Sequence, residues 1–367
     1  MIGRLFRVSI FGESHGKCVG TLIEGCPPGI EVSEELIRRE LARRRPGSSP
    51  VTTPRREADE PEILSGVFRG RTTGAPIVII VRNRDVDSRP YEVIKWLPRP
   101  SHADYVARVK YWGFNDYRGG GIFSGRLTAA LVAAGAVAKA LLSKYGIHVY
   151  SYVTSVGDVE ALVNPEDSEL FRELIDSSPV KCPDPRASEA IVKLIKEVME
   201  CGDSVGGVVE TIVFNLPVGL GEPPIDTLDG DLAKAIFTIP GVKGIEFGAG
   251  FGMARMRGSE ANDPLTIKGG EVVPKTNKSG GINGGLSNGA PLVFRVAFRP
   301  TPTISKPQRT VDLRSMEEVV VTYSGRHDPC IAIRAAPVVE AVTSIVITDH
   351  LLRWLSWGAT RSRILGH

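Results

Sequence analysis

Residues 126–146 read RLTAALVAAGAVAKALLSKYG, and this alanine-rich stretch constrains the fold more than any other part of the chain. Small apolar residues occupy nearly every position, whereas a surface helix has one apolar stripe and one polar face. A helix with small side chains on most of its faces needs close neighbours on most sides. We therefore predict a central helix here, which ends at Gly146, with the rest of the chain packed around it.

Helices and strands alternate irregularly along the other segments, with no clean linker and no internal repeat. Ser33 is a strong helix N-cap, followed by an acidic first turn. This pattern favours one interleaved α/β or α+β unit over 1–367. We predict strands at 5–10, 75–82, 147–157, 205–217, 290–300 and 316–325, helices at 34–44, 102–112, 186–201, 229–241 (capped by aspartate) and 337–354, and no periodic structure at 244–289.

Composition and charge exclude several classes of protein. The chain of 367 residues has a net charge of +3, which is too small to indicate nucleic-acid or membrane binding by itself. Five cysteines without a C-x-x-C pair argue against a disulfide framework or a zinc site, and we predict no metal. The first apolar run is short and interrupted by Arg7, and the tract Leu127 to Leu142 is too short and alanine-rich for a membrane span. We expect a cytoplasmic protein that binds neither membrane nor nucleic acid.

Arginines and hydroxyl residues are concentrated between residues 37 and 56. Guanidinium forks and hydroxyl groups are suited to binding a phosphate or carboxylate. We interpret Arg38, Arg39 and Arg43 as a solvated helix face. An RNA-binding arm is an alternative, although the segment lacks the aromatic residues of a base-stacking surface. The better candidates for anion binding are Arg44, Arg45, Arg55 and Arg56.

Three of the six histidines lie in unusual segments. His15 stands in FGESHGK between glycines, His102 in RPSHADY, and His327 beside Asp328 in SGRHDP. Each segment has a structural alternative, with His15 as a turn residue, His102 at a helix start and Asp328 as the cap of a proline turn. Their concentration nevertheless favours acid/base chemistry on an anionic substrate.

Two glycine-rich segments complete the set. YRGGGIFSGR, residues 117–126, places three glycines before a helix start, which is typical of a backbone cradle for an anion. GGINGGLSNGAP, residues 280–291, allows backbone to approach a flat ring or a phosphate, and a surface loop is the alternative.

These motifs, in this order and over nearly the whole chain, resemble those of the chorismate synthase family: GESHG, RRRPGSSPVTTPRRE, RPSHADY, YRGGGIFSGR, GGINGGLSNGAP and GRHDPCIAIRA. The resemblance implies a carbon–oxygen lyase that converts 5-enolpyruvylshikimate 3-phosphate to chorismate and phosphate and requires reduced FMN. It also implies a homotetramer and an α+β fold, a β-α-β sandwich with central helices between antiparallel sheets. The family usually has glycine where this chain has Ser101.

The resemblance also assigns roles to individual residues. It implies that His15, His102 and Asp328 are catalytic. Its flavin contacts match Arg44, Ile122, Phe123, Ser124, Gly284, Arg299, Pro300, Thr301, Pro302, Thr303 and Arg326. Its substrate ligands match Ser14, Arg44, Arg55, Arg99, Ser124, Arg126 and Arg326.

How the flavin becomes reduced is left open by the resemblance. A bifunctional form would reduce FMN with NADPH by itself. The sequence has no separate nicotinamide domain, so we expect a separate flavin reductant.

Overall fold

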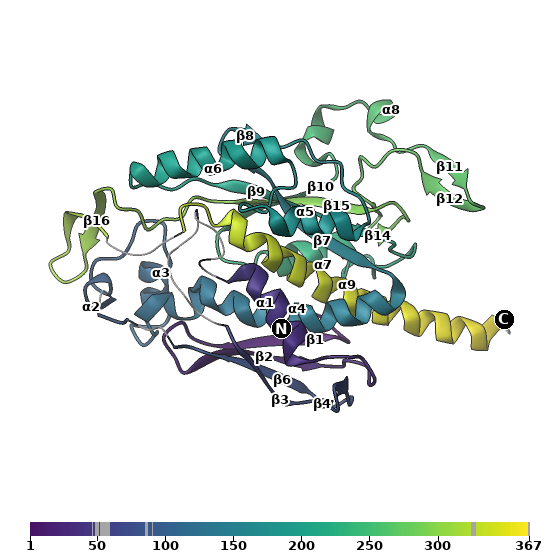
Figure 1. The fold of residues 1–367 in the computed structure, drawn as a ribbon, viewed down its shortest axis with the longest axis horizontal. Coiled ribbons are helices and arrows are strands. Elements are labelled where there is room, and N and C mark those ends of the chain that lie inside the picture. The colour runs from purple at the N-terminus through teal and green to yellow at the C-terminus, as the bar shows by residue number, and fades with distance from the viewer. Residues whose placement is uncertain are drawn as a thin grey trace.

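The computed structural model describes residues 1–45, 47, 51, 59–84, 87–89, 91–323 and 328–365. These residues form two antiparallel sheets together with long helices, which confirms the predicted α+β class. In Figure 1 one sheet lies at the bottom, the helices α1, α4 and α9 lie in the middle, and the second sheet lies above them.

The lower sheet is built from the first quarter of the chain. Its apolar side chains Val8, Val19, Ile23, Ile77 and Ile79 are almost completely buried. The strand order is β1 (Arg7–Gly12), β2 (Cys18–Glu24), β6 (Ile77–Arg82) and β3 (Pro61–Ser65), with neighbours antiparallel.

The upper sheet lies across the central helices from the lower sheet (Figure 1). Its central strands supply Val209, Leu292, Phe294 and Val296 to the core. The strand order is β10 (Val242–Phe247), β15 (Leu292–Phe298), β9 (Gly207–Phe214), β7 (His148–Val156) and β8 (Val159–Glu160). The helices on this side are α5 (Glu169–Ser177), α6 (Pro185–Glu200) and α7 (Leu228–Ile236).

The alanine-rich segment forms the central helix that the sequence predicts. In α4 (Thr128–Leu142) every residue except Lys139 and Ala140 is buried. It packs against α9 (Ala332–Leu365) so closely that a Cβ at Gly135 would lie 2.4 Å from Ala341 Cβ. Small residues are therefore required where these two helices meet. The third central helix is α1 (Glu34–Arg44), capped by the Ser33 hydroxyl as predicted.

Two helical stretches are long and apolar enough to cross a membrane by length and composition, Gly125–Tyr145 and Ala332–Gly358. Within their most apolar windows, 78% and 94% of the residues are buried inside the protein. Because their apolar surface already packs in the core, both stretches have the character of core helices.

Several predicted boundaries were wrong for identifiable reasons. The last helix begins at Ala332 and continues through Pro337, because a proline in the first turns removes only one backbone hydrogen bond. Thr227, and not an aspartate, caps α7 by accepting a hydrogen bond from Gly230 N at 3.2 Å. Strand β10 extends into the stretch predicted to be aperiodic, since a register shift between Val242 and Gly244 breaks its alternation. Strand β2 was not predicted.

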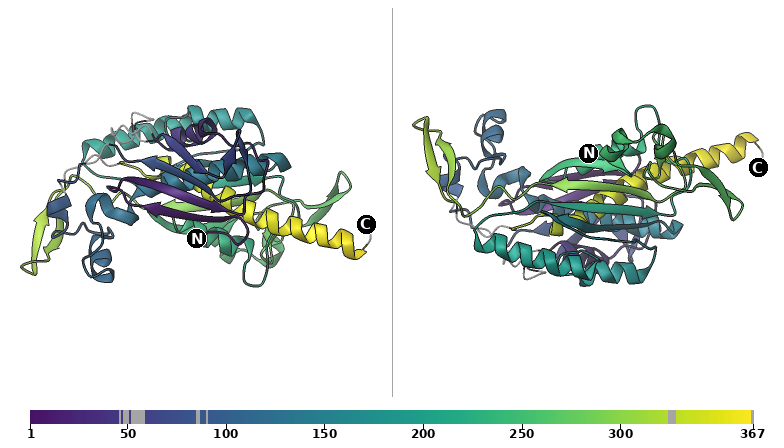
Figure 2. Two further views of the ribbon diagram at one scale, coloured as in Figure 1. Left: turned by 90° about the horizontal axis from the view of Figure 1, so that it is seen from below. Right: turned by 90° about the horizontal axis from the view of Figure 1, so that it is seen from above.

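The remaining elements are short. Figure 2 shows the β11–β12 and β16–β17 hairpins and the end of α9 projecting at the two ends of the molecule. The helical segments are α2 (Tyr91–Ile94), α3 (Asp104–Lys110), α8 (Gly258–Ala261), η1 (Arg118–Phe123), η2 (Gly125–Leu127), η3 (Ser143–Tyr145) and η4 (Gly250–Arg255). The hairpins are β4 (Val67–Phe68) with β5 (Arg71–Thr72), β11 (Leu265–Lys268) with β12 (Glu271–Pro274), β13 (Ile282–Asn283) with β14 (Leu286–Ser287), and β16 (Gln308–Asp312) with β17 (Glu317–Val321).

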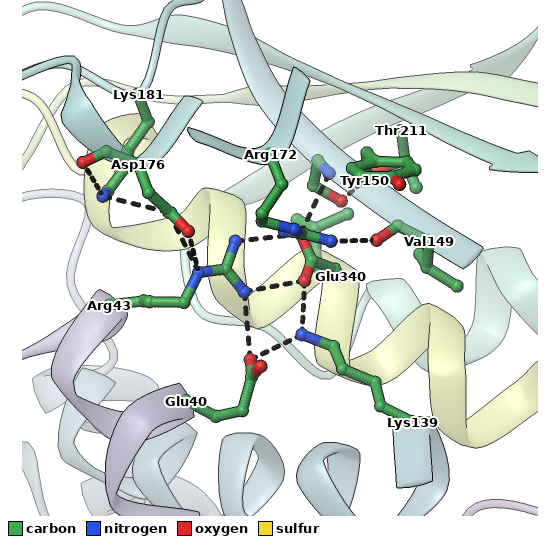
Figure 3. Close-up of polar contacts among 12 residues, drawn as sticks. Glu40, Arg43, Lys139, Val149, Tyr150, Arg172, Asp176, Lys181, Thr211 and Glu340 are labelled. Atoms are coloured by element: carbon green, nitrogen blue, oxygen red, sulfur yellow. Dashed lines mark hydrogen bonds and ion pairs between the residues drawn. The ribbon is translucent and has the colours of Figure 1, made fainter. Parts of the chain in front are cut away.

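A buried cluster of charges, which we call the Glu340 cluster, joins the central helices to the upper sheet (Figure 3). The fully buried Glu340 carboxylate accepts hydrogen bonds from Arg43 at 2.7 Å, from Arg172 at 2.7 Å and from Ser151 N at 3.1 Å. The sequence predicts Arg43 on a solvated helix face. This prediction is wrong, because the Arg43 side chain is buried against Glu340. The cluster comprises Glu40, Arg43, Lys139, Arg172, Asp176, Lys181 and Glu340.

Candidate active site

Most of the predicted site residues line one pocket of about 270 Å³. The pocket lies where the β1–β2 turn, the C-terminal end of α1, the segments before α3 and α4, the segment after β15 and the start of α9 meet. These segments are far apart in the sequence, and the two sheets and the central helices bring them together. The predicted residues in its lining are Ser14, His15, Arg44, Arg99, His102, Phe123, Ser124, Arg126, Arg299, Thr301, Pro302, Thr303 and Asp328.

His15 is held by contacts on two sides of its ring. Its Nδ1 lies 2.9 Å from Ser88 Oγ, and the ring packs edge-on against Tyr91 with centroids 5.1 Å apart. Gly119 lies so close that a Cβ there would be 2.4 Å from His15 Cδ2 and 2.5 Å from Ser14 Oγ. The triple glycine, which we interpreted as an anion cradle, therefore also makes room for this histidine.

His102 has charged neighbours instead. Its Nδ1 lies 2.8 Å from Asp104 Oδ1 and 3.1 Å from Arg99 Nη2. Arg99 in turn donates to Asp104 through its backbone N at 3.0 Å and through Nε and Nη2, both at 2.8 Å. Burial by itself would raise the pKa of Asp104, but hydrogen bonds from Arg99 and His102 outweigh it and lower the pKa well below its usual value. Ser101 has a φ of 58°, a backbone region that favours glycine, which the family usually has at this position.

Two hydroxyl groups connect the β1–β2 turn with the start of the central helix. Ser124 Oγ lies 3.1 Å from Ser14 Oγ and accepts a hydrogen bond from Arg126 N at 3.2 Å. Both serines line the pocket. The glycine segment and the first histidine segment are thus parts of one wall.

Behind this wall, Arg44 and Arg126 share one buried carboxylate, that of Asp59. Arg44 contacts Asp59 Oδ2 at 3.1 Å, and Arg126 contacts Oδ1. Arg126 also donates to Asn83 Oδ1 at 2.8 Å. Burial alone would raise the pKa of Asp59, but the charges of Arg44 and Arg126 outweigh it and lower that pKa. Both arginines therefore combine an ion pair inside the protein with a place in the pocket lining.

Asp328 also faces the pocket and pairs with an arginine. Its carboxylate lies 2.5 Å from Arg334 Nη1, and its carbonyl accepts a hydrogen bond from Thr301 Oγ1 at 2.6 Å. Arg334 donates through Nε to the carbonyl of Arg44 at 3.1 Å. Arg334 therefore links the acidic residue to the end of α1.

The opposite wall combines polar and apolar groups. Thr303 Oγ1 accepts from Arg99 at 3.4 Å, and Arg299 donates to the carbonyl of Ser101, so the segment after β15 contacts the segment that carries His102. Desolvation lowers the pKa of Arg299. The apolar part of the lining is formed by Phe123, Ile239, Pro240, Ile331, Ala335 and Val338.

Not every predicted residue lines the pocket. Ile122 and Pro300 adjoin lining residues but are not part of it, and Gly284 lies in the turn between β13 and β14. Arg55 and Arg326 lie outside the described residues. The site residues that we did not predict include Tyr91, Thr128, Gly241 and Arg334 in the lining and Asp59 behind it. Asp59 and Asp104 could have been found by searching for the carboxylates that pair with the predicted arginines, because buried arginines require anionic partners.

The lining defines the class of site. Among the described residues it contains five arginines and two histidines but only one carboxylate, that of Asp328. No group of three His, Cys, Asp or Glu side chains in this part of the chain is placed to hold a metal ion. Such a pocket, lined by both cationic and apolar side chains, fits an enzyme that acts on small anionic molecules, including one with a flat ring.

Comparison with known proteins identifies the family. The family model for chorismate synthase matches residues 6–352. Chorismate synthase from Aeropyrum pernix is 61% identical over 351 residues, which cover 96% of this chain and 92% of the relative. The enzyme from Thermococcus kodakarensis is 56% identical over 357 residues, 97% of this chain and 99% of the relative. A crystal structure of chorismate synthase superposes with a TM-score of 0.76 at 34% identity, covering 96% of this chain and 93% of that one. The chain therefore belongs to the chorismate synthase family.

Proposed function

We propose that this protein catalyses the reaction of its family, the 1,4-elimination of phosphate from 5-enolpyruvylshikimate 3-phosphate that gives chorismate, with reduced FMN as the cofactor. The observation that carries the proposal is the convergence of His15, His102 and Asp328 in one cationic pocket. The substrate carries a phosphate and carboxylates, and guanidinium groups bind both.

The residues of the pocket fit a bound flavin together with the substrate. The apolar lining residues, which include Phe123, Ile239 and Ile331, suit a flat ring, and Arg44 and Arg299 suit its phosphate side chain. Arg99, Arg126, Ser14 and Ser124 remain our proposed ligands of the substrate. Reduced FMN, when bound, supplies electron density to the reaction and recovers it, so that there is no net redox change.

The chain's own residues have the chemistry to move protons. An imidazole with an ordinary pKa of about 6.5 donates a proton readily near neutral pH. We assign His15, which lies beside the Ser14 and Ser124 hydroxyls, to the leaving phosphate, and His102 to the flavin side. Asp328 is our proposed proton acceptor, held in place by Arg334.

Further properties follow from family membership as proposals. We propose a cytoplasmic homotetramer that depends on a separate flavin reductant, and a single domain in which the layers of Figure 1 correspond to the family's β-α-β sandwich. A bifunctional form that oxidises NADPH is the alternative. The described arginines 38, 39, 43 and 44 all pair with carboxylates, which disfavours an RNA-binding arm.

The proposal is tested by an anaerobic assay of the purified protein with 5-enolpyruvylshikimate 3-phosphate, with and without reduced FMN. We expect chorismate and phosphate only when reduced FMN is present. Adding NADPH with oxidised FMN, in place of reduced FMN, tests the bifunctional form. Product formation with NADPH and no added reductase would replace our proposal of a separate reductant.

A further inference from the structure

The two pocket histidines differ in the partner of Nδ1, a hydroxyl for His15 and a carboxylate for His102. We propose that Asp104 is a positioning residue that holds neutral His102 in the Nδ1–H tautomer and thereby presents an unprotonated Nε2 to the pocket. The importance of this tautomer for catalysis rests on the proposed function, but the tautomer itself is a property of the free protein.

Two groups compete for Nδ1 of His102, and they require opposite tautomers. Asp104 Oδ1, at 2.8 Å, accepts a proton from Nδ1, whereas Arg99 Nη2, at 3.1 Å, has only protons to donate. The carboxylate contact is the shorter one, and a hydrogen bond to an ionised acceptor is about twice as strong as a neutral one. Arg99 Nη2 is also already directed at Asp104 Oδ1, at 2.8 Å. The geometry therefore favours Nδ1–H donating to Asp104.

The surroundings of Asp104 keep it ionised and in place. Its two oxygens accept from Arg99 at the backbone N, Nε and Nη2, so the carboxylate cannot rotate away without losing three hydrogen bonds. The opposite edge of the His102 ring faces Gly120, where a Cβ would lie 3.3 Å from Cε1 and 3.8 Å from Nε2. A side chain at this position would crowd that edge of the ring, and glycine avoids the contact.

The chain provides a closely matched control. Asp116 accepts from Arg118 in the same way, through the backbone N at 3.0 Å, Nε at 2.8 Å and Nη2 at 2.7 Å. Its side chain is 12% exposed, compared with 11% for Asp104. The two aspartates differ in the exposure of the partner, 42% for Arg118 and 4% for Arg99, and in that Asp104 also contacts the His102 ring. Asp116→Asn therefore controls for the loss of an arginine-paired carboxylate.

The experiment is solid-state NMR of ¹⁵N-histidine-labelled protein without substrate or flavin, with His102→Gln used to assign the His102 signals. It is carried out at about pH 8.5, and the spectra also report whether the ring carries one proton or two. We expect the Nδ1–H tautomer in the parent protein and in Asp116→Asn. In Asp104→Asn we expect a shift to the Nε2–H tautomer, with Nδ1 accepting from Arg99.

An Nε2–H tautomer in the parent protein, or an unchanged tautomer in Asp104→Asn, would overturn the proposal. Turnover measured on the same variants is a second readout. We expect Asp104→Asn to lower kcat by at least about tenfold, the lower end of acid/base effects, and Asp116→Asn to leave it within about twofold. Because the NMR result needs no reaction, failure of the proposed lyase activity and failure of the tautomer assignment are distinguishable.

Discussion

Arg43 and Arg44 are neighbours on α1, yet they enter two differently constructed charged regions. Arg43 belongs to the Glu340 cluster, in which carboxylates and cations alternate and neutralise one another inside the protein (Figure 3). Arg44 belongs to the pocket wall, in which each carboxylate lies behind or beside arginines that also face the cavity. In the Glu340 cluster the charges pair with one another inside the protein, whereas the pocket wall keeps a cationic surface that can bind a ligand.

The comparison shows how the protein stabilises several arginines around one pocket. Five arginines face one cavity, and they repel each other unless anions compensate them. Three carboxylates compensate four of them. Asp59 pairs with Arg44 and Arg126. Asp104 pairs with Arg99, and Asp328 pairs with Arg334. Substitutions in the Glu340 cluster should therefore reduce stability, whereas substitutions in the wall should reduce activity.

The largest effect on activity is expected for the two histidines. His15→Ala and His102→Ala should each lower turnover by roughly 10²- to 10⁴-fold, the usual range for a positioned general acid or base, with little change in thermal stability. His148→Ala is the control, because His148 is exposed on β7 and pairs with Asp167 outside the pocket. Turnover within threefold of the parent in either pocket variant would contradict the assignment.

The largest effect on stability is expected for Glu340→Gln. Removal of one partner from a buried ion cluster costs about 3–5 kcal/mol of unfolding free energy, because the remaining charges stay buried. Urea unfolding measures the change, and Glu197→Gln is the control because Glu197 forms only an exposed pair with Lys193 at 4.0 Å. The control should change stability by less than about 0.5 kcal/mol. Equal effects of the two substitutions would remove the distinction between the regions.

Arg126 combines the properties of the two regions, because it lines the pocket and also forms an ion pair inside the protein. Arg126→Ala should weaken substrate binding by about 2–5 kcal/mol, because an anionic group of the ligand loses its partner. From the sequence alone we would expect little change in stability, but the structure pairs Arg126 with buried Asp59. We now expect a loss of about 1–3 kcal/mol of unfolding free energy as well. A loss of stability without a loss of affinity would make Arg126 purely structural.

Asp328→Asn should have a smaller effect on turnover. The substitution keeps the size of the side chain and leaves the bond from Thr301 to the carbonyl of residue 328 unchanged. We expect near-normal folding and FMN binding, with turnover lower by at least about tenfold. Asp312→Asn, which removes an arginine-paired carboxylate on the β16–β17 hairpin, should leave turnover unchanged. Equal turnover in the two variants would mean that another group accepts the proton.

The smallest expected effect is a pH dependence of stability. Burial alone would raise the pKa of Glu340, but Arg172, Arg43 and Lys139 outweigh it and hold the pKa well below its usual value. The ionised Glu340 carboxylate therefore contributes fully to the free energy of unfolding above about pH 4.3, the pKa of glutamate in the unfolded chain. This contribution is lost as the pH falls through the lower pKa of Glu340 in the folded protein. Below about pH 4.3, the difference in unfolding free energy between the parent and Glu340→Gln should narrow by at most about 1.4 kcal/mol per pH unit. A constant difference down to about pH 3 would contradict this account.

The sequence predicted most of the pocket because its residues lie in short motifs with distinctive chemistry. Glycines around His15, the RPSHADY segment and the start of α4 all indicate local geometry that the structure contains. It also predicted the central helix, because an alanine-rich segment has few other ways to be buried.

The sequence did not predict the partners that determine what each arginine does. Arg43 and Arg44 have the same local context, and only packing against α9 and α4 directs one to Glu340 and the other to Asp59. Strand β10 was missed because the bulge between Val242 and Gly244 breaks the alternation on which strand prediction depends. Long-range pairing and local irregularity were therefore the information that the sequence patterns lacked.

The central claim is that the cationic pocket performs an elimination and not a net oxidation. The most direct measurement is the amount of chorismate formed per FMN oxidised, with one initial charge of reduced FMN under strictly anaerobic conditions. Our account predicts many chorismate molecules per flavin, with phosphate released in equal amount. A ratio near one would contradict the elimination and would indicate an ordinary oxidoreductase.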